Sequence, residues 1–484
     1  MTKSKKWTAA LLALGLGVNS ARAAEPTGSA QPTQSELMAQ IDALKAKVNA
    51  MEQKQASFDS RDIDATVAAV LKDADRHSMV VDSGAVTAGW DKSRYGFFIS
   101  SEDGASTFHP GLLWQFRNVT NYRQNGKPQG TATQSKNSDT QNGFENSRLK
   151  PYIDGTLFTK DLSYKFQWAF DRNSGALTVD DAIVQYVFAK NVLLGGDLAV
   201  KAGQYKPQVF HEEYTGDQAS FAADRSLANQ LIGGTPVGPR VQGVSLLMTG
   251  ANTPVHGELM FHDGDGSVNT DFQERRPAVA PATIGKTVNK GAAGRIEYKF
   301  FGDWKDQSSY TSHLAKSDLL IIGGGIDASE QDHSNSFRYS ADVQYKMAEK
   351  LSAAAAVYGV YIDSRNVVTS ATVPSTQRHD LGGMAQLGYE INPAVELFGR
   401  YSLVHQDHNF VAVTAGQPQN IHEITAGVNW YLGEKGAFGN HAKITVDATY
   451  LPNGSPADFT QADILKNANK KDEFILRAQF QLWI

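Results

Sequence analysis

The 484-residue chain contains no cysteine and, beyond its first 23 residues, no apolar run long enough to form a membrane-spanning helix. The absence of cysteine excludes a disulfide framework, thiolate catalysis, and zinc or iron–sulfur sites with cysteine ligands. The best apolar stretch, residues 351–362, is shorter than the roughly 18 to 20 residues that a transmembrane helix needs. If this chain spans a membrane, it therefore does so with strands.

The sequence also has no excess of basic residues, because its formal charge is −5 at pH 7. Nucleic-acid-binding proteins usually carry a positive patch, so no nucleic-acid partner is expected. Residues 1–23 contain a basic start, an apolar run from Trp7 to Val18 and an Ala21-Arg22-Ala23 cleavage signal. This layout predicts a secretory signal peptide, and the short apolar run disfavours the alternative of a membrane anchor. Removal of its four basic residues would leave a charge of −9.

A helical pattern follows a polar linker at residues 24–34. Within residues 35–58 apolar side chains recur at steps of three and four, which predicts about three heptads of coiled coil. The repeating residues are Leu37, Ile41, Leu44, Val48 and Met51. The alternative is a single amphipathic helix lying on another domain. Residues 59–94 are expected to form a helical or irregular connector.

From about Tyr95 to the last residue, apolar and polar side chains alternate with the period of two that is typical of β-strands. Residues 162–171, for example, place four aromatic side chains on one face and charged side chains on the other. In a soluble sandwich the apolar face would point inward. In an outer-membrane barrel it faces lipid, and the charged face lines a water-filled lumen. Many such strands without covering helices favour the barrel.

The number of strands and the lengths of the connections support this interpretation. The pattern gives about seventeen strands, whereas bacterial barrels built from one chain have even numbers. We assign residues 95–101 to a small hairpin before the barrel, which leaves about 16 strands within residues 95–484. Short turns alternate with long polar tracts, as in bacterial outer-membrane barrels. The predicted fold is thus all-β: a 16-stranded antiparallel transmembrane β-barrel in outer-membrane lipid, preceded by a coiled coil in the periplasm.

The predicted lumen face carries basic side chains that would attract anions. The candidates among them for contact with an anion are Arg148, Lys165, Lys201, Arg295, Arg338, Arg400 and Arg477, and Lys150 and Lys299 fall on the same face. Each of them could instead form a structural ion pair on the barrel wall.

Three short motifs follow one another between residues 201 and 250: GQYKP at 203–207, DRSL at 224–227 and RVQGV at 240–244. Their order resembles that of the phosphate-selective porin O and P family, and similar stretches cover most of residues 95–484. The chain differs from that family in two respects. It ends on Ile484 where an aromatic residue is usual, and it mixes acidic with basic residues on its predicted lumen face.

This resemblance implies a homotrimeric porin for passive diffusion of small hydrophilic solutes or ions, including anions such as phosphate. It further implies that the loop at 207–239 folds inward as a constriction. Lys206, Arg225 and Arg240 then become candidates for contact with a permeating anion.

The motifs of enzymes are incomplete in this sequence. HEEYT at 211–215 and HEITA at 422–426 lack the second histidine of a zinc-protease helix, and no G-x-S-x-G nucleophile elbow is present. We therefore predict no enzymatic activity, no catalytic residue, no metal and no cofactor. Two other functions remain open at this point: an outer-membrane anchor whose periplasmic coiled coil tethers the envelope, and a soluble periplasmic β-sandwich.

Overall fold

The computed structural model describes residues 34–56, 86–123, 140–172, 174–233, 240–264, 290–331, 334–364, 377–407, 419–454 and 472–484. The predicted signal peptide and most of the predicted linker and connector lie outside these ranges. The chain divides into two units, residues 1–83 and 84–484. In the first unit, helix α1 (Gln34–Ala56) covers most of the predicted coiled-coil segment; its assembly into a coiled coil stays a prediction. No helix in the described ranges is both long and apolar enough to cross a membrane.

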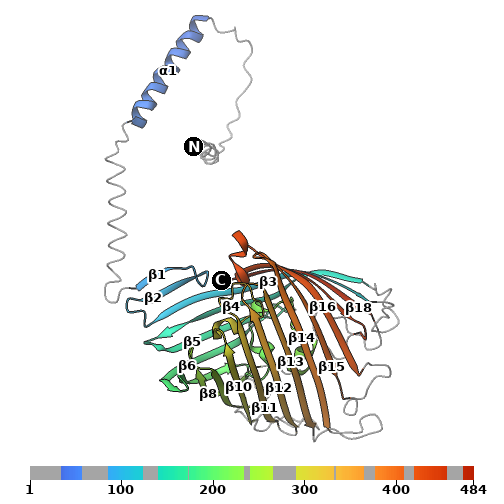
Figure 1. The fold of residues 1–484 in the computed structure, drawn as a ribbon. Helices are drawn as coiled ribbons and strands as arrows, with labels where there is room; N and C mark the ends of the chain where they lie inside the picture. Colours follow the sequence, from blue (N-terminus) through green and yellow to red (C-terminus); the bar gives the residue numbers. More distant parts are fainter. Residues whose placement is uncertain are drawn as a thin grey trace, which may run out of the picture. The chain divides into compact units, whose positions relative to one another are not determined.

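The second unit is a closed barrel of sixteen antiparallel strands, β3 to β18 (Figure 1). Each strand pairs with its neighbours in the sequence, and β18 pairs with β3, which closes the ring and leaves no free edge. The predicted all-β barrel of about sixteen strands is confirmed. The strands are β3 (Thr107–Arg123), β4 (Thr140–Leu157), β5 (Thr159–Phe170), β6 (Leu177–Leu193), β7 (Gly196–Tyr205), β8 (Val241–Thr249), β9 (Val255–His262), β10 (Lys290–Phe301), β11 (Leu319–Gln331), β12 (Ser334–Met347), β13 (Leu351–Ser364), β14 (Gln377–Asn392), β15 (Val395–His405), β16 (Asn420–Tyr431), β17 (Ala442–Leu451) and β18 (Glu473–Trp483).

A two-stranded hairpin precedes the ring. Its strands β1 (Val86–Asp91) and β2 (Gly96–Ser101) pair along their whole length. Only two residues of β2 pair with β3, opposite Thr107 and Phe108. Residues 95–101 therefore lie outside the ring of sixteen strands. Their partner strand β1 falls within residues 59–94, which we expected to be a helical or irregular connector, so that expectation is wrong for residues 86–91.

The polarity of the barrel is inverted relative to a soluble protein. On the outer face, Tyr389 of β14 and Trp430 of β16 are 46% and 53% exposed. On the inner face, Glu396 of β15 and Asn429 of β16 are 0% exposed. The same alternation runs along β14, β15, β16 and β18. A strand with an apolar outer face and a polar inner face suits a wall between hydrocarbon and water.

Connections alternate between the two rims of the barrel. Short turns join β4 to β5, β6 to β7, β8 to β9, β12 to β13 and β14 to β15; we call this end the short-turn rim. The last residue, Ile484, exchanges backbone hydrogen bonds with Leu112 of β3 at 2.9 and 3.0 Å.

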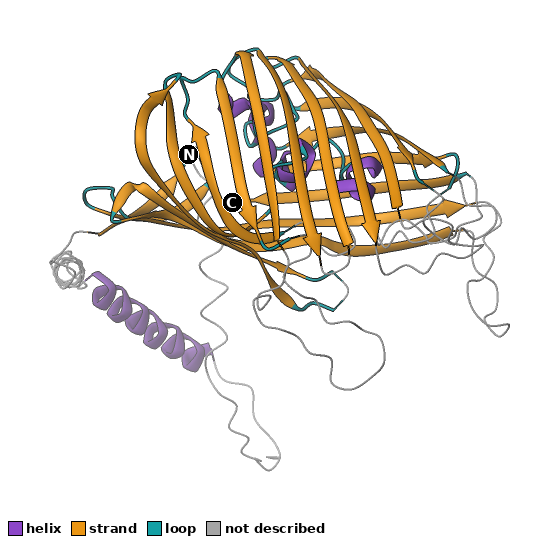
Figure 2. Cartoon of the chain, turned by 90° about the horizontal axis from the view of Figure 1, so that it is seen from below, coloured by secondary structure: helices purple, strands orange, loops and turns teal. Residues whose placement is uncertain are grey.

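Two connections fold into the barrel instead of lying on a rim (Figure 2). Between β7 and β8 lie α3 (His211–Tyr214), the 3-10 turn η1 (Asp217–Ala219) and the π turn η2 (Asn229–Gly233). Between β10 and β11 lies α4 (Trp304–Gln307). The apolar core joins these segments to the inner faces of neighbouring strands, and includes Phe210, Phe221, Tyr310, Tyr358 and Phe398.

Two features differ from the sequence-based expectation. Residues 122–147 form a long polar tract in the sequence, yet β4 already begins at Thr140. Backbone pairing with β3 extends this strand without any apolar periodicity, from Tyr122 opposite Thr140 onward. The sequence pattern also gave no indication that residues 302–318 enter the barrel.

Candidate functional site: a charged cavity inside the barrel

The segment 206–233, which we call the inner loop, is anchored to the inner face of the barrel. The Asp224 carboxylate accepts hydrogen bonds from Arg117 at 2.8 Å and Arg148 at 3.4 Å, and Arg477 lies 3.3 Å away. Arg400 donates to the Asp224 carbonyl at 2.9 Å. Since buried carboxylates need partners of opposite charge, this cluster holds the middle of the inner loop in place.

Backbone groups of the inner loop add further anchors to β15, β16 and β17. The Ala223 amide donates to Asp447 at 2.8 Å, the Leu227 amide to Glu423 at 2.5 Å, and the Ala228 amide to the Ser402 hydroxyl at 3.0 Å. The Tyr310 amide of the second inserted segment donates to the Ala219 carbonyl at 3.0 Å. The inner loop therefore lies against the β15–β17 wall.

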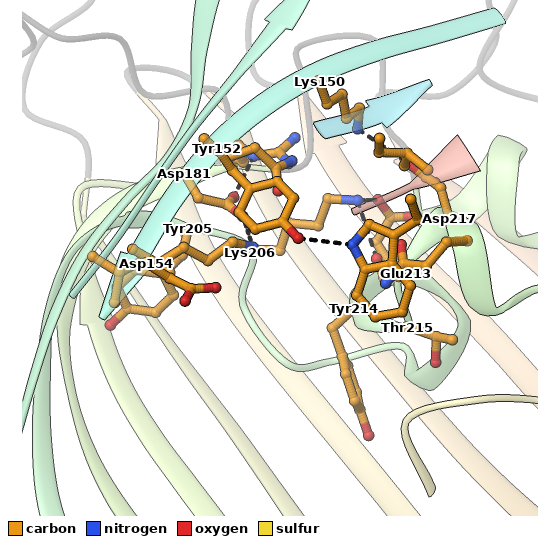
Figure 3. Close-up of a pocket in the computed structure, with 18 of the residues that line it drawn as sticks. Lys150, Tyr152, Asp154, Asp181, Tyr205, Lys206, Glu213, Tyr214, Thr215 and Asp217 are labelled. Atoms are coloured by element: carbon orange, nitrogen blue, oxygen red, sulfur yellow. Dashed lines mark hydrogen bonds and ion pairs between the residues drawn. The ribbon is translucent and has the colours of Figure 1, made fainter. Parts of the chain in front are cut away.

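A cavity of about 420 Å³ remains between the inner loop and the wall formed by β4 to β7. Figure 3 shows Lys150, Tyr152, Asp181 and Tyr205 on the wall, with Glu213, Thr215 and Asp217 on the loop. Seven basic residues line the cavity, and so do four acidic ones, so the lining carries more positive than negative charge. The basic residues are Arg94, Lys150, Lys165, Lys201, Lys206, Arg225 and Arg240; the acidic residues are Asp154, Asp181, Glu213 and Asp217.

Asp217 joins the inner loop to the wall. Its carboxylate lies 2.9 Å from Arg225, 2.9 Å from Lys150 and 3.2 Å from Arg148. Burial alone would raise the pKa of Asp217, but these three cations together with Lys206 hold it well below its usual value. The carboxylate is therefore ionised at any physiological pH, and it partly neutralises the cations around it.

A bulge in β6 directs two consecutive carboxylates to one cation. The register of β5 and β6 shifts between Gln167 and Trp168, which leaves Asp180 as the extra residue. Arg240 then lies 3.0 Å from Asp180 and 2.8 Å from Asp181. Bulges commonly redirect side chains in this way. Asp181 also accepts a hydrogen bond from Lys165 at 2.9 Å.

Lys206 is the first residue of the inner loop and directly follows β7. Its ammonium group pairs with the Glu213 carboxylate and donates to the Glu213 carbonyl at 3.0 Å. Burial, reinforced by the neighbouring charge of Arg225, lowers the pKa of Lys206 to about 8. Its charge is therefore sensitive to pH within the physiological to mildly alkaline range.

Five of the ten basic residues proposed from the sequence line this cavity: Lys165, Lys201, Lys206, Arg225 and Arg240. The other five do not. Arg148, Arg400 and Arg477 bond to the inner loop, as described above. Arg295 pairs with Glu297 at 2.7 Å and Asp342 at 2.7 Å and borders a smaller cavity of about 150 Å³, and Arg338 is buried in the inner face of β12.

Two lining cations were absent from that set of ten. Lys150 lies on the predicted lumen face of its strand, two residues after Arg148, so the alternation already indicated its position. Arg94 lies on the turn between β1 and β2, and no strand pattern could place it in the cavity. Within the described ranges, no group of three or more His, Asp or Glu residues could hold a metal ion.

No protein-family model matches the sequence, and no curated protein matches it. Solved structures do resemble it. An anion-selective porin from Comamonas acidovorans is 11% identical, with 78% of this chain and all of that chain covered and a TM-score of 0.50. OmpF of Salmonella typhi, in complex with daunomycin, is 12% identical over 78% of this chain and 98% of that one, with a TM-score of 0.48.

The outer-membrane channel DcaP of Acinetobacter baumannii is also 12% identical, over 79% of this chain and 99% of that one, with a TM-score of 0.45. At such low identity, the likeness to the Comamonas barrel shows a shared fold. The chain thus shares its barrel fold with a solved porin.

Proposed function

We propose that this protein is a porin of the bacterial outer membrane, through which small hydrophilic solutes diffuse passively, with a preference for anions. The observation that carries the proposal is the inverted polarity of the barrel around a charged cavity. Apolar side chains face outward, while the cavity between the inner loop and the β4–β7 wall is lined by seven basic and four acidic residues.

The physical basis is the cost of moving an ion across hydrocarbon. A bare ion in a low-dielectric medium costs on the order of tens of kcal/mol, and a hydrated lumen avoids that cost. Charged groups along the lumen then favour ions of opposite sign. The inner loop acts as the constriction in this proposal, because it fills the β15–β17 side and leaves the charged cavity as the route for solutes.

The proposed preference is for anions in general, phosphate among them. Each cation that lines the cavity has a carboxylate within 4 Å, as in the pairs Lys201–Glu258 at 2.8 Å and Lys165–Asp181 at 2.9 Å. Such pairing weakens the field on a permeating ion. It supports a moderate anion preference instead of a tight phosphate site.

We also propose that the chain belongs to the phosphate-selective porin O and P family. The order of motifs between residues 201 and 250 supports this proposal.

A homotrimer with a periplasmic coiled coil is also part of the proposal. On α1 the apolar side chains Ile41, Leu44 and Val48 are exposed in the single chain, at spacings of three and four residues. Such a stripe is covered when helices associate. Crosslinking of the purified protein in detergent tests the trimer, and deletion of residues 35–58 tests whether α1 contributes to it.

The function is tested by reconstituting the purified protein in a planar lipid bilayer. Stable conductance steps are expected, and the reversal potential in a potassium chloride gradient should have the sign of an anion-preferring pore. Replacing chloride by phosphate or a dicarboxylate compares the anions directly. The absence of conductance from correctly folded protein would contradict the porin function and favour the role of an envelope anchor.

A further inference from the structure

The hairpin before the barrel brings a cation into the lumen. Arg94 lies on the turn between β1 and β2, outside the sixteen-stranded ring, yet its side chain lines the same cavity as Lys150 and Asp217. The guanidinium group donates from one nitrogen to both oxygens of Asp154, each at 2.7 Å. Asp154 belongs to β4, close to its end at the short-turn rim.

The tip of the hairpin is held in this position by the barrel itself. The Tyr95 hydroxyl donates to the Ala437 carbonyl at 3.0 Å, and its ring contacts Phe438 and His441 with centroids 5.6 and 4.8 Å apart. These partners belong to the connection between β16 and β17 at the short-turn rim. The hairpin turn therefore bridges that connection and β4, and Arg94 is directed toward the cavity.

The pair of Arg94 and Asp154 sets the charge of this end of the cavity. Both side chains are partly open to solvent, at 43% and 23% exposure. His109 lies 3.3 Å from the same carboxylate, and Trp483 and Tyr152 complete the lining there. Without Arg94, the Asp154 carboxylate would be the only permanently charged group among these side chains. The local charge would therefore change from neutral to negative.

We propose that Arg94 is a selectivity-determining residue at the short-turn end of the pore, and that the β1–β2 hairpin serves to deliver its charge there. The inference rests on the proposed pore function and extends it to a segment outside the barrel. An anion that leaves the cavity at this end passes the Arg94–Asp154 pair, which has no net charge. A cation on the same path is not attracted by the Asp154 carboxylate, because Arg94 balances its charge.

The test compares charge variants of this pair by reversal potential in a potassium chloride gradient at low salt. Arg94→Ala should lower the chloride-to-potassium permeability ratio about twofold or more, and Arg94→Glu should lower it further, since each leaves more negative charge near the ion. Asp154→Asn should raise the ratio. The double variant Arg94→Ala with Asp154→Asn restores neutrality and should return the ratio close to that of the wild type.

Two control variants separate charge from hairpin position. Lys92→Ala removes an exposed cation from the same turn that does not line the cavity, and Tyr95→Phe removes an anchoring hydrogen bond without a change of charge. Lys92→Ala should keep the wild-type ratio, whereas Tyr95→Phe, which weakens the contact that holds Arg94 at the cavity, should lower the ratio by less than Arg94→Ala does. If Arg94→Ala also keeps it while the wild type conducts, the inference about Arg94 is wrong and the pore function stands. If the wild type does not conduct, the proposed function fails instead.

Discussion

The role of Asp217 gives the sharpest prediction about selectivity. Its carboxylate contacts Arg225, Lys150 and Arg148, and it lines the cavity from the inner loop. Replacement by the isosteric asparagine keeps hydrogen-bonding capacity but removes one negative charge. Three cations then lose part of their compensation, so the field that a permeating ion meets becomes more positive.

The size of this effect follows from Coulomb's law. A unit charge about 5 Å from an ion in water contributes about 0.8 kcal/mol, which 0.1 M salt screens to about 0.5 kcal/mol. The contribution has opposite signs for chloride and potassium, so the difference between them changes by about 1 kcal/mol. Since 1.4 kcal/mol corresponds to a factor of ten, the chloride-to-potassium permeability ratio of Asp217→Asn should rise about fivefold.

Reversal potentials in a potassium chloride gradient measure this ratio. Asp217→Glu, which keeps the charge, and Asp103→Asn, which removes an exposed carboxylate from the β2–β3 turn, are the matched controls and should leave the ratio unchanged. A ratio that stays constant or falls in Asp217→Asn, in protein that still conducts, would refute the reasoning that the inner loop faces the permeating ion.

Three further predictions concern pH, the anchoring of the inner loop and the outer face. Because the pKa of Lys206 is lowered to about 8, its positive charge is present at pH 7 and lost by pH 9. The anion preference of the wild type should fall over that range, and reversal potentials of Lys206→Gln should show a smaller fall. Asp224→Ala removes the carboxylate that Arg117 and Arg148 contact, so single-channel recordings should show larger and noisier conductance; an unchanged trace would contradict the anchoring role. Leu387→Lys should destabilise the barrel by about 2–4 kcal/mol in urea unfolding from vesicles, and equal stability of this variant and Leu387→Ala would argue against a lipid-facing position.

The faces of the strands could be predicted because alternation is a local property of the sequence. Arg477 and Leu476, for instance, fall on opposite faces by position alone, and the structure buries the first and exposes the second. The strand at residues 95–101 could likewise be separated from the ring because barrels of one chain have even strand numbers, whereas its partner strand β1 was not predicted.

Most partners of the inward cations could not be predicted, because they come from other strands; Glu297, two residues after Arg295 on the same face of β10, is an exception. Arg295 on β10 pairs with Asp342 on β12, and Arg477 on β18 pairs with Asp447 on β17. Alternation places a residue on the lumen face but does not say which side chain lies beside it. It therefore could not separate the cations that line the cavity from those, such as Arg400, that hold the inner loop.

The inserted segment at residues 302–318 was missed for a related reason. It has neither strand nor extended helix periodicity, and its position depends on single contacts. The Trp304 indole donates to the Thr253 carbonyl at 2.8 Å, and the Lys346 ammonium group donates to the Thr311 carbonyl at 2.7 Å. Contacts of this kind join residues that are far apart in the sequence and come together only in the folded barrel. A local sequence pattern therefore does not indicate them.

The orientation of the wall, with apolar side chains toward lipid and charged side chains toward water, is tested most directly by labelling single cysteines. The natural chain has no cysteine, so each substitution introduces one defined thiol. In protein reconstituted in vesicles, Lys165→Cys should react with a charged, membrane-impermeant thiol reagent and lose conductance, while Ile424→Cys should stay unlabelled. Labelling of the Ile424 position with protection of the Lys165 position would contradict the entire account.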